Sequence, residues 1–267
     1  MEPRSSALSE QQSPLTYGSY LKVDELLSLQ DPQSNPVAAD ELLFIIIHQS
    51  YELWFRLVIS ELDKVVTLLE HQDLIPAFHL LERVSLVFKS LIQQIDILET
   101  MTPVAFNQFR AKINPASGFQ SWQFRELELL AGGTPQDYSR FASLEPEWFH
   151  KLQKRGNQPN LRSSFIKLLQ KRKLLSESFT PEAFQKALLS IYNKPIQDEL
   201  QTLCEFLIGF DEQILLWRFR HVQMVERMIG MKHGTGGSLG VPYLESTLRK
   251  KFFPELWEAR TQMGVLN

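Results

Sequence analysis

The chain is poor in cysteine and has no long apolar run. Cys204 is its only cysteine among 267 residues, so a disulfide framework within the chain is excluded, and this usage suits a reducing compartment. No uninterrupted apolar run approaches the roughly 20 residues that cross a bilayer. The polar start, MEPRSSALSEQQSP, lacks the apolar core of a signal peptide. We therefore expect a cytoplasmic protein without a membrane segment.

The chain also lacks a strong excess of one charge. Its 28 basic and 31 acidic residues give a net charge of −3, so there is no general attraction to nucleic acids or to anionic membranes. Hydrophobic residues make up 43% of the chain and charged residues 22%. These proportions are typical of a globular protein with a sizeable core.

Convincing strand alternation is absent as well, and helical spacing takes its place. Residues 1–14 are rich in Ser, Gln and Glu, which predicts a disordered tail. Residues 15–267 read as one all-α domain, a helical bundle with few residues between helices. Apolar periodicity and turn signals predict helices over 39–71, 75–101, 122–130, 146–154, 161–177, 181–192, 195–231 and 244–259.

Glycine is scarce, yet four of the 12 glycines gather around Thr235 in the stretch HGTGGSLG. A phosphate-binding loop of the P-loop type needs a lysine in a fixed place, and a dinucleotide-binding loop follows a strand. This loop follows a long helix and has no such lysine. The sequence therefore argues against a nucleotide loop, and a helix-terminating loop is the simplest alternative.

Two histidines lie on apolar helical faces. His48 shares a face with Phe44 and Tyr51, and His221 shares one with Trp217. A neutral core histidine would explain either one alone, but the pair favours a metal site or an axial ligand of haem in a wide apolar slot. Zinc is disfavoured, because the chain has no HExxH motif and only one cysteine. A non-haem iron site of two histidines and a carboxylate stays open.

An arginine precedes a turn that is a candidate site loop. Arg110 comes just before the NPASG turn, where its guanidinium could bind a carboxylate in bidentate fashion. A surface arginine is the alternative.

Four stretches of the chain, taken together, resemble the bacterial tryptophan 2,3-dioxygenase family. They are TYGSYLKVDELLSLQ, DELLFIIIHQSYELWF, NPASGFQSWQFRELE and WRFRHVQMVERMIGMKHGTGGSLGVPYL, and they follow the family's order over nearly the whole chain. The resemblance implies an all-helical haem b enzyme with one haem per subunit, usually a homotetramer. Such an enzyme inserts both atoms of O2 across the indole C2–C3 bond of L-tryptophan. The product is N-formylkynurenine, the first intermediate of tryptophan catabolism through kynurenine.

The resemblance also implies roles for particular residues. His221 would be the axial ligand of the haem iron, and His48 would lie on the opposite, distal side near the indole N–H. Arg110 would pair with the substrate carboxylate. Thr235 would contact the amino-acid end of the substrate, and the glycine loop around it would be a lid that orders when substrate binds.

Further positions of the family's pocket match as well. Phe44 would wall the indole site, and Ser117 and Gly118 would border the distal side. Tyr20 and Leu21 would reach into the pocket of a neighbouring subunit.

The chain departs from the family's pattern in two places. Phe106 stands where the family commonly has tyrosine, and Ala39 begins a stretch in which the family has His-Asp-Glu. Phe106 keeps a ring beside the substrate but removes a hydroxyl partner. The alternative function is therefore a related haem-dependent oxygenase that acts on a substituted tryptophan or another aromatic amino acid.

Overall fold

A computed structural model describes residues 14–134, 139, 142, 145–194, 198–235 and 239–264. Within these ranges every regular element is a helix and no strand occurs. The prediction of an all-α fold is confirmed. The expected N-terminal tail, apart from Pro14, lies outside the described residues.

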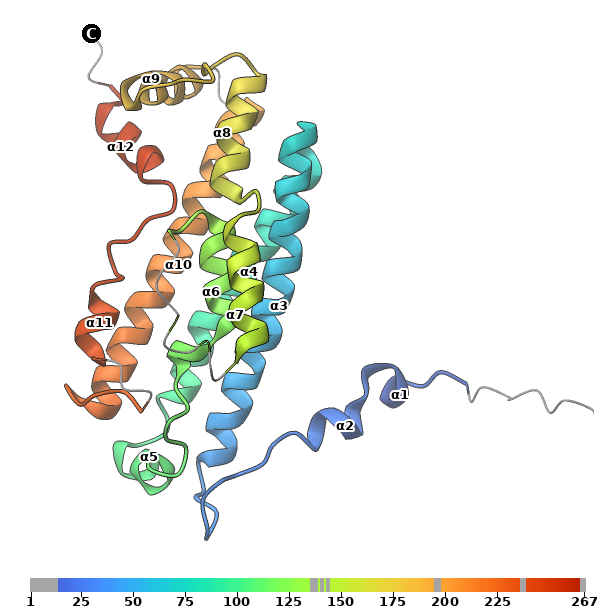
Figure 1. Ribbon diagram of the computed structural model, residues 1–267, viewed down its shortest axis with the longest axis vertical. Coiled ribbons are helices and arrows are strands. Elements are labelled where there is room, and N and C mark those ends of the chain that lie inside the picture. Colours follow the sequence, from blue (N-terminus) through green and yellow to red (C-terminus); the bar gives the residue numbers. More distant parts are fainter. Residues whose placement is uncertain are drawn as a thin grey trace, which may run out of the picture.

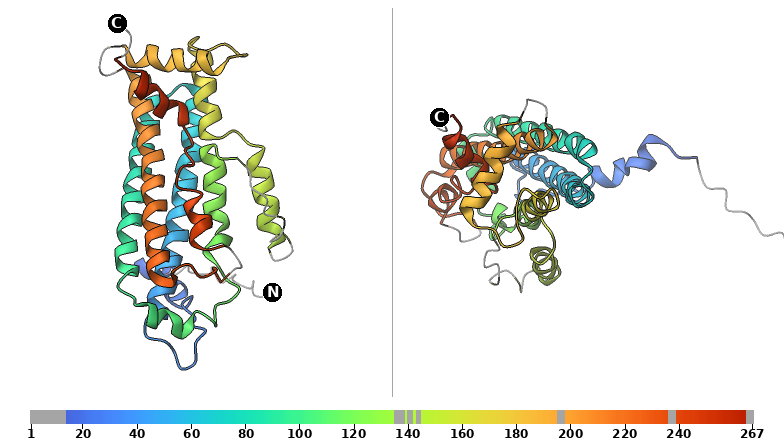
Figure 2. Two further views of the ribbon diagram at one scale, coloured as in Figure 1. Left: turned by 90° about the vertical axis from the view of Figure 1, so that its left-hand side faces the viewer. Right: turned by 90° about the horizontal axis from the view of Figure 1, so that it is seen from above.

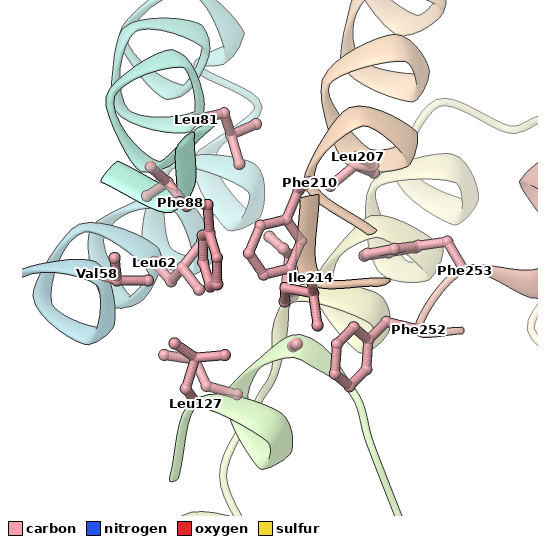
Figure 3. Close-up of a cluster of buried hydrophobic side chains, with 14 of the residues drawn as sticks. Val58, Leu62, Leu81, Phe88, Leu127, Leu207, Phe210, Ile214, Phe252 and Phe253 are labelled. Atoms are coloured by element: carbon pink, nitrogen blue, oxygen red, sulfur yellow. The ribbon is translucent and has the colours of Figure 1, made fainter. Parts of the chain in front are cut away.

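Long helices form the body of the molecule and lie side by side (Figures 1 and 2). Helix α3 (Glu41–His71) packs against α4 (Leu74–Leu98), and α4 packs against α10 (Glu199–Ile229). Two shorter helices, α6 (Trp122–Ala131) and α8 (Leu161–Lys171), both pack against α3. Their buried faces meet in one core, in which the fully buried rings include Phe88 and Phe210 (Figure 3).

Local capping explains where several helices begin. At α9 (Pro181–Tyr192), the Thr180 hydroxyl accepts a hydrogen bond of 3.2 Å from the Ala183 amide, and Pro181 takes the first helical position. The sequence predicted this cap correctly. Helix α5 (Pro103–Phe109) begins in the same way after Thr102, but it was not predicted because its seven residues are too few to show a helical period.

The predicted helix over 244–259 is wrong. The chain instead forms α11 (Val241–Glu245) and α12 (Pro254–Gln262), separated by nonhelical residues. Pro254 opens α12 and disfavours helical geometry at Phe253, whose φ and ψ are −123° and 57°. The predicted helix over 161–177 is also too long, since α8 ends at Lys171. The start of the predicted helix over 195–231 falls partly on residues 195–197, outside the described part of the chain.

Two segments lie outside the core. Helix α7 (Pro146–Gly156) packs on the side of the body against α6. Helices α1 (Tyr17–Leu21) and α2 (Val23–Leu27) have no buried residue and form an arm that projects from the body (Figure 1). The N-terminal arm, residues 14–30, has no buried residue, and hydrogen bonds between its last two residues and Gln49 join it to α3.

Helix α3 bears on the expectation that the chain has no membrane segment. By length and composition alone, it is long and apolar enough to cross a bilayer, and only 22% of its most apolar window is buried inside the chain. Its inner side carries core residues such as Val58 and Leu62. Its exposed apolar residues are Leu42, Ile46, Leu53 and Trp54.

Candidate functional site

A cavity of about 260 Å³ lies at the end of the body where α3 begins and α10 ends. Residues from these two helices, from α5, α6 and α11, and from the loops that join them form its wall. The wall is mainly apolar and aromatic, as expected of a site for a flat organic ligand. Its apolar residues include Phe55, Ile95, Leu98, Met101, Val222 and Met228.

His48 lies on α3, in the cavity wall, and its ring orientation is fixed by the helix itself. Its Nδ1 lies 2.7 Å from the Phe44 carbonyl oxygen. Because a carbonyl can only accept, Nδ1 carries the proton and Nε2 of the neutral ring is left as an acceptor. Burial lowers the pKa of His48, although the hydrogen bond to Phe44 and the charge of Glu52 act to raise it. The imidazole is therefore neutral at pH 7.

His221 lies on α10 and lines the same cavity. Its ring stacks on Trp217, with centroids 5.2 Å apart and planes inclined by 5°. Burial lowers the pKa of His221 to about 4, with a smaller contribution from His48 and Arg125. A neutral imidazole is the form that binds a metal, so His221 is ready to act as a ligand at pH 7.

The donor set decides between the two kinds of iron site. Among the described residues, no three side chains of His, Cys, Asp or Glu gather so that they could hold a metal ion. A bare iron ion needs such a set, whereas haem iron needs one axial side chain from the protein. The arrangement favours haem.

The two predicted substrate anchors line this cavity as well. Arg110 is the C-terminal cap of α5, and its Nη2 donates to the His233 carbonyl at 2.6 Å. The Thr235 hydroxyl donates to the Ala116 carbonyl at 2.5 Å. The two bonds connect the segment after α5 with the glycine loop.

The glycine loop is described only in part. Gly234, Thr235 and Gly240 line the cavity, whereas residues 236–238 lie outside the described residues. Gly240 has a φ of +67°, and a Cβ there would lie 2.5 Å from the Lys232 carbonyl oxygen, so this position requires glycine. Closure of the loop over a substrate stays a prediction.

Other predicted residues divide into two groups. Phe44 packs against Phe106, with ring centroids 5.6 Å apart, and both line the cavity. Ser117 and Gly118 line it too. The remaining two, Tyr20 and Leu21, are 71% and 44% exposed on the N-terminal arm and do not belong to the cavity of their own chain.

Sequence reasoning missed a buried charge cluster in the wall. The Glu128 carboxylate forms ion pairs with Arg125 Nη1 at 2.6 Å and with Arg218 Nη2 at 2.8 Å. Over the whole wall, the arginines Arg110, Arg125 and Arg218 outnumber the glutamates Glu52 and Glu128. One indication of this cluster was visible in the sequence: Arg218, next to Trp217, is a charged residue on the apolar face of a long helix.

Comparison with known proteins gives one consistent family. The family model described as tryptophan 2,3-dioxygenase matches residues 2–174 and 150–263. A tryptophan 2,3-dioxygenase of Herpetosiphon aurantiacus is 44% identical over 262 residues, covering 93% of this chain and 98% of the relative. Enzymes of the same name from a Nocardioides species and from Caulobacter vibrioides are 42% and 40% identical, with 96% and 93% of this chain covered and 98% of each relative.

Proposed function

The chain belongs to the tryptophan 2,3-dioxygenase family, and on that premise we propose how its cavity carries out the reaction. The enzyme oxidises L-tryptophan with O2 and opens the indole C2–C3 bond to give N-formylkynurenine. The observation that carries this proposal is the placement of two neutral imidazoles, His48 and His221, in one apolar cavity together with Arg110.

The lining of the cavity supports one haem b per subunit. Haem is a flat apolar ring with two carboxylates, and the wall combines apolar and aromatic side chains with an excess of arginine over glutamate. His221 would hold the haem iron, since its neutral ring is stacked on Trp217 and lies in a wall of apolar side chains. Arg125 and Arg218 carry two positive charges against the one negative charge of Glu128 between them, so this cluster keeps a net positive charge in the wall that suits the carboxylates. Haem, when bound, supplies the activation of O2.

The substrate would be held at both ends. Arg110 can exchange its hydrogen bond to the His233 carbonyl for a charge-assisted pair with the substrate carboxylate. Thr235 contributes a hydroxyl to the same amino-acid end. Phe44 and Phe106 offer ring faces to the indole.

His48 would orient the indole instead of acting as a strong base. Its Nε2 is the acceptor nitrogen, because Nδ1 binds the Phe44 carbonyl, and the indole N–H is a donor only. A hydrogen bond from the indole to Nε2 fixes the ring within the cavity. Positioning of this kind accelerates a reaction because it removes the entropy of alignment from the barrier.

We infer a homotetramer in the cytoplasm. The N-terminal arm has no buried residue, and the outer side of α3 is apolar and exposed. Both surfaces need a cover, and a second copy of the chain can provide it. In such an assembly Tyr20 and Leu21 would complete the pocket of a neighbouring subunit. Cys204 is free and buried, in keeping with a reducing compartment.

The deciding experiment is a single-turnover assay with product analysis. The protein is loaded with haem, reduced without oxygen, and then mixed with O2 and L-tryptophan. A product heavier than tryptophan by both oxygen atoms, labelled twice from ¹⁸O2, supports the proposal. A product with one labelled atom, or turnover only of a substituted tryptophan, would contradict it.

A further inference from the structure

Glu52 is a carboxylate of the cavity wall that the proposed mechanism does not use. It lies on α3 one helical turn after His48, half-buried, and lines the cavity. Its hydrogen-bond partners among the described residues are neutral groups of the loop that leads into α6 and of α6 itself.

Each oxygen of the Glu52 carboxylate accepts a hydrogen bond from the segment that leads into and begins α6. The Ser121 hydroxyl donates to Oε1 at 2.6 Å, and the Gln123 side-chain amide donates to Oε2 at 2.8 Å. The Gln123 amide also donates to the Glu52 backbone carbonyl at 2.8 Å. Hydrogen bonds to a charged acceptor are the stronger kind, so Glu52 is a firm connection between α3 and the start of α6.

Ser121 passes this connection on to the backbone. Its hydroxyl donates to Glu52 and accepts from the Phe124 amide at 3.3 Å, which caps α6. The Ser121 amide in turn donates to the Gly118 carbonyl at 3.2 Å. The short turn Gly118–Gln120 ends at Ser121 and is therefore fixed from this side.

The segment that Glu52 holds is attached to the rest of the chain at other points as well, among them the Phe119 ring, whose centroid lies 5.3 Å from that of Tyr243 and 4.9 Å from the Arg125 guanidinium carbon. Residues 114–116 and Gly118 are exposed. Thr235 binds the Ala116 carbonyl, and Arg125 Nε lies 3.5 Å from the Phe119 carbonyl. Among the hydrogen bonds of the described residues, those of Glu52 are the ones that join this stretch and the start of α6 directly to α3.

We propose that Glu52 is a positioning residue of the substrate pocket, because its carboxylate, through Ser121 and Gln123, holds the turn with Ser117 and Gly118 in place beside His48. The inference rests on the proposed function and on the expectation that Ser117 and Gly118 border the distal side of the pocket, where His48 lies. Glu52 does not touch the reacting atoms. It sets the width of the pocket between α3 and the turn.

Three variants separate this role from general stability. Glu52→Ala removes both carboxylate hydrogen bonds. Glu52→Gln removes the charge but can keep the geometry, since its carbonyl can accept from Gln123 and its amide can donate to the Ser121 hydroxyl, which has two acceptor sites. Asp63→Ala is the matched control, because the Asp63 carboxylate on α3 also accepts two hydrogen bonds, from Arg155 at 2.7 and 3.0 Å, away from the cavity.

The measurements are steady-state kinetics with L-tryptophan, haem content, and hydrogen exchange of the backbone amides of residues 117–121. For Glu52→Ala we expect wild-type haem content, faster exchange in the turn, and a fall in kcat/KM on the order of 10²-fold, which is the effect of displacing a substrate by about 1 Å. Glu52→Gln should recover most of this loss. Asp63→Ala should keep the slow exchange of the turn and the wild-type kcat/KM.

Two results would overturn the inference. One is wild-type exchange and kinetics in Glu52→Ala, and the other is an equal loss of kcat/KM in Asp63→Ala. If Glu52→Ala does not fold, Ser121→Ala breaks the same connection at its other end and is judged by the same readouts. A wild-type chain that is inactive on tryptophan would refute the proposed function instead, while the exchange of the turn would still report on Glu52.

Discussion

The two cavity histidines are held in different ways, and this difference separates their roles. His48 has one ring nitrogen occupied by the Phe44 carbonyl. The His221 ring stacks on the ring of Trp217, and no hydrogen bond of its imidazole occurs among the described residues. Under the proposed function, the indole contact belongs to His48, whose fixed tautomer leaves Nε2 as an acceptor, and the iron belongs to His221, whose place in the sequence matches the family's ligand.

The first prediction concerns these two side chains. His221→Ala should abolish haem retention, whereas His48→Ala should keep haem bound and lower kcat, because only the orienting contact to the indole is lost. Haem content by absorbance, measured beside the activity, checks both. Wild-type haem stoichiometry in His221→Ala would remove this residue from its role as the ligand.

The second prediction concerns Arg110. Arg110→Ala should raise KM for L-tryptophan on the order of tenfold to a hundredfold, since a charge-assisted hydrogen bond is worth about 1.5–3 kcal/mol. The effect should be much smaller with tryptamine, which lacks the carboxylate. Equal losses with both substrates would show that Arg110 acts through the structure of the glycine loop and does not bind the carboxylate.

The sequence predicted the residues whose signal is local. His48 and His221 are recognisable because each interrupts an apolar helical face, and Arg110 because it precedes a turn. Glu52 and the Arg125–Glu128–Arg218 cluster were missed. Their partners are distant along the chain, or their burial depends on how the helices pack, and one sequence does not reveal either.

At the level of helices, Asp211 shows how a side chain fixes an element that periodicity did not predict. Its carboxylate on α10 is fully buried and accepts from the amides of Phe252 and Phe253 and from Trp257 Nε1, at 3.0, 3.2 and 3.0 Å. These bonds hold the start of α12 against α10.

The third prediction follows from this contact. Asp211→Ala leaves three buried N–H groups without a partner, so it should lower the free energy of unfolding by on the order of 3 kcal/mol or more. Glu212→Ala, which truncates the exposed neighbouring carboxylate, should change it by less than about 0.5 kcal/mol. Urea unfolding of both variants tests the difference. Similar values for the two would argue against the anchor.

A second buried carboxylate connects the loop that follows the N-terminal arm to the start of α3. Glu41 accepts hydrogen bonds from the Gln33 and Ser34 amides, at 2.7 and 3.1 Å, and from the Ser34 hydroxyl. Burial acts to raise the pKa of Glu41, but the hydrogen bonds from Ser34 and Gln33 together lower it below its ordinary value of 4.5.

The fourth prediction is a pH dependence. Because the pKa of Glu41 is lower in the folded than in the unfolded chain, its contribution to stability is present above pH 4.5. The contribution is lost as the pH falls through the folded value. Glu41→Gln, which does not titrate, should therefore lose less stability than wild type over this acid range. Parallel curves of unfolding free energy against pH for the two proteins would contradict the prediction.

Helices of ten or more residues were predicted to exist, although α8 was predicted too long, whereas the shorter ones were missed or merged. The period of α3, α4 and α10 extends over several turns, so their existence was evident from the sequence. Helix α5 was missed, and α11 and α12 were merged, because capping, proline and contacts such as that of Asp211 decide where short helices begin and end.

At the scale of the whole molecule, the N-terminal arm and the outer side of α3 are surfaces that their own chain does not cover. Tyr17, Tyr20 and Leu27 are 79%, 71% and 69% exposed. Nothing in a single sequence says how such surfaces pair, since periodicity shows which residues are apolar but not which surface covers them. In the proposed oligomer, their burial would depend on association between subunits and therefore on protein concentration.

The projection of the arm also has a genetic consequence. If each arm serves a neighbour's pocket, two kinds of inactive subunit can repair one another. A chain without residues 1–30 keeps its own haem site, and a His221→Ala chain keeps its arm. Coexpressed, the two should form mixed oligomers in which truncated subunits regain activity. Activity that stays absent in verified mixed oligomers would refute the shared pocket. A damaged arm would thus be recessive when coexpressed with a chain that retains its arm.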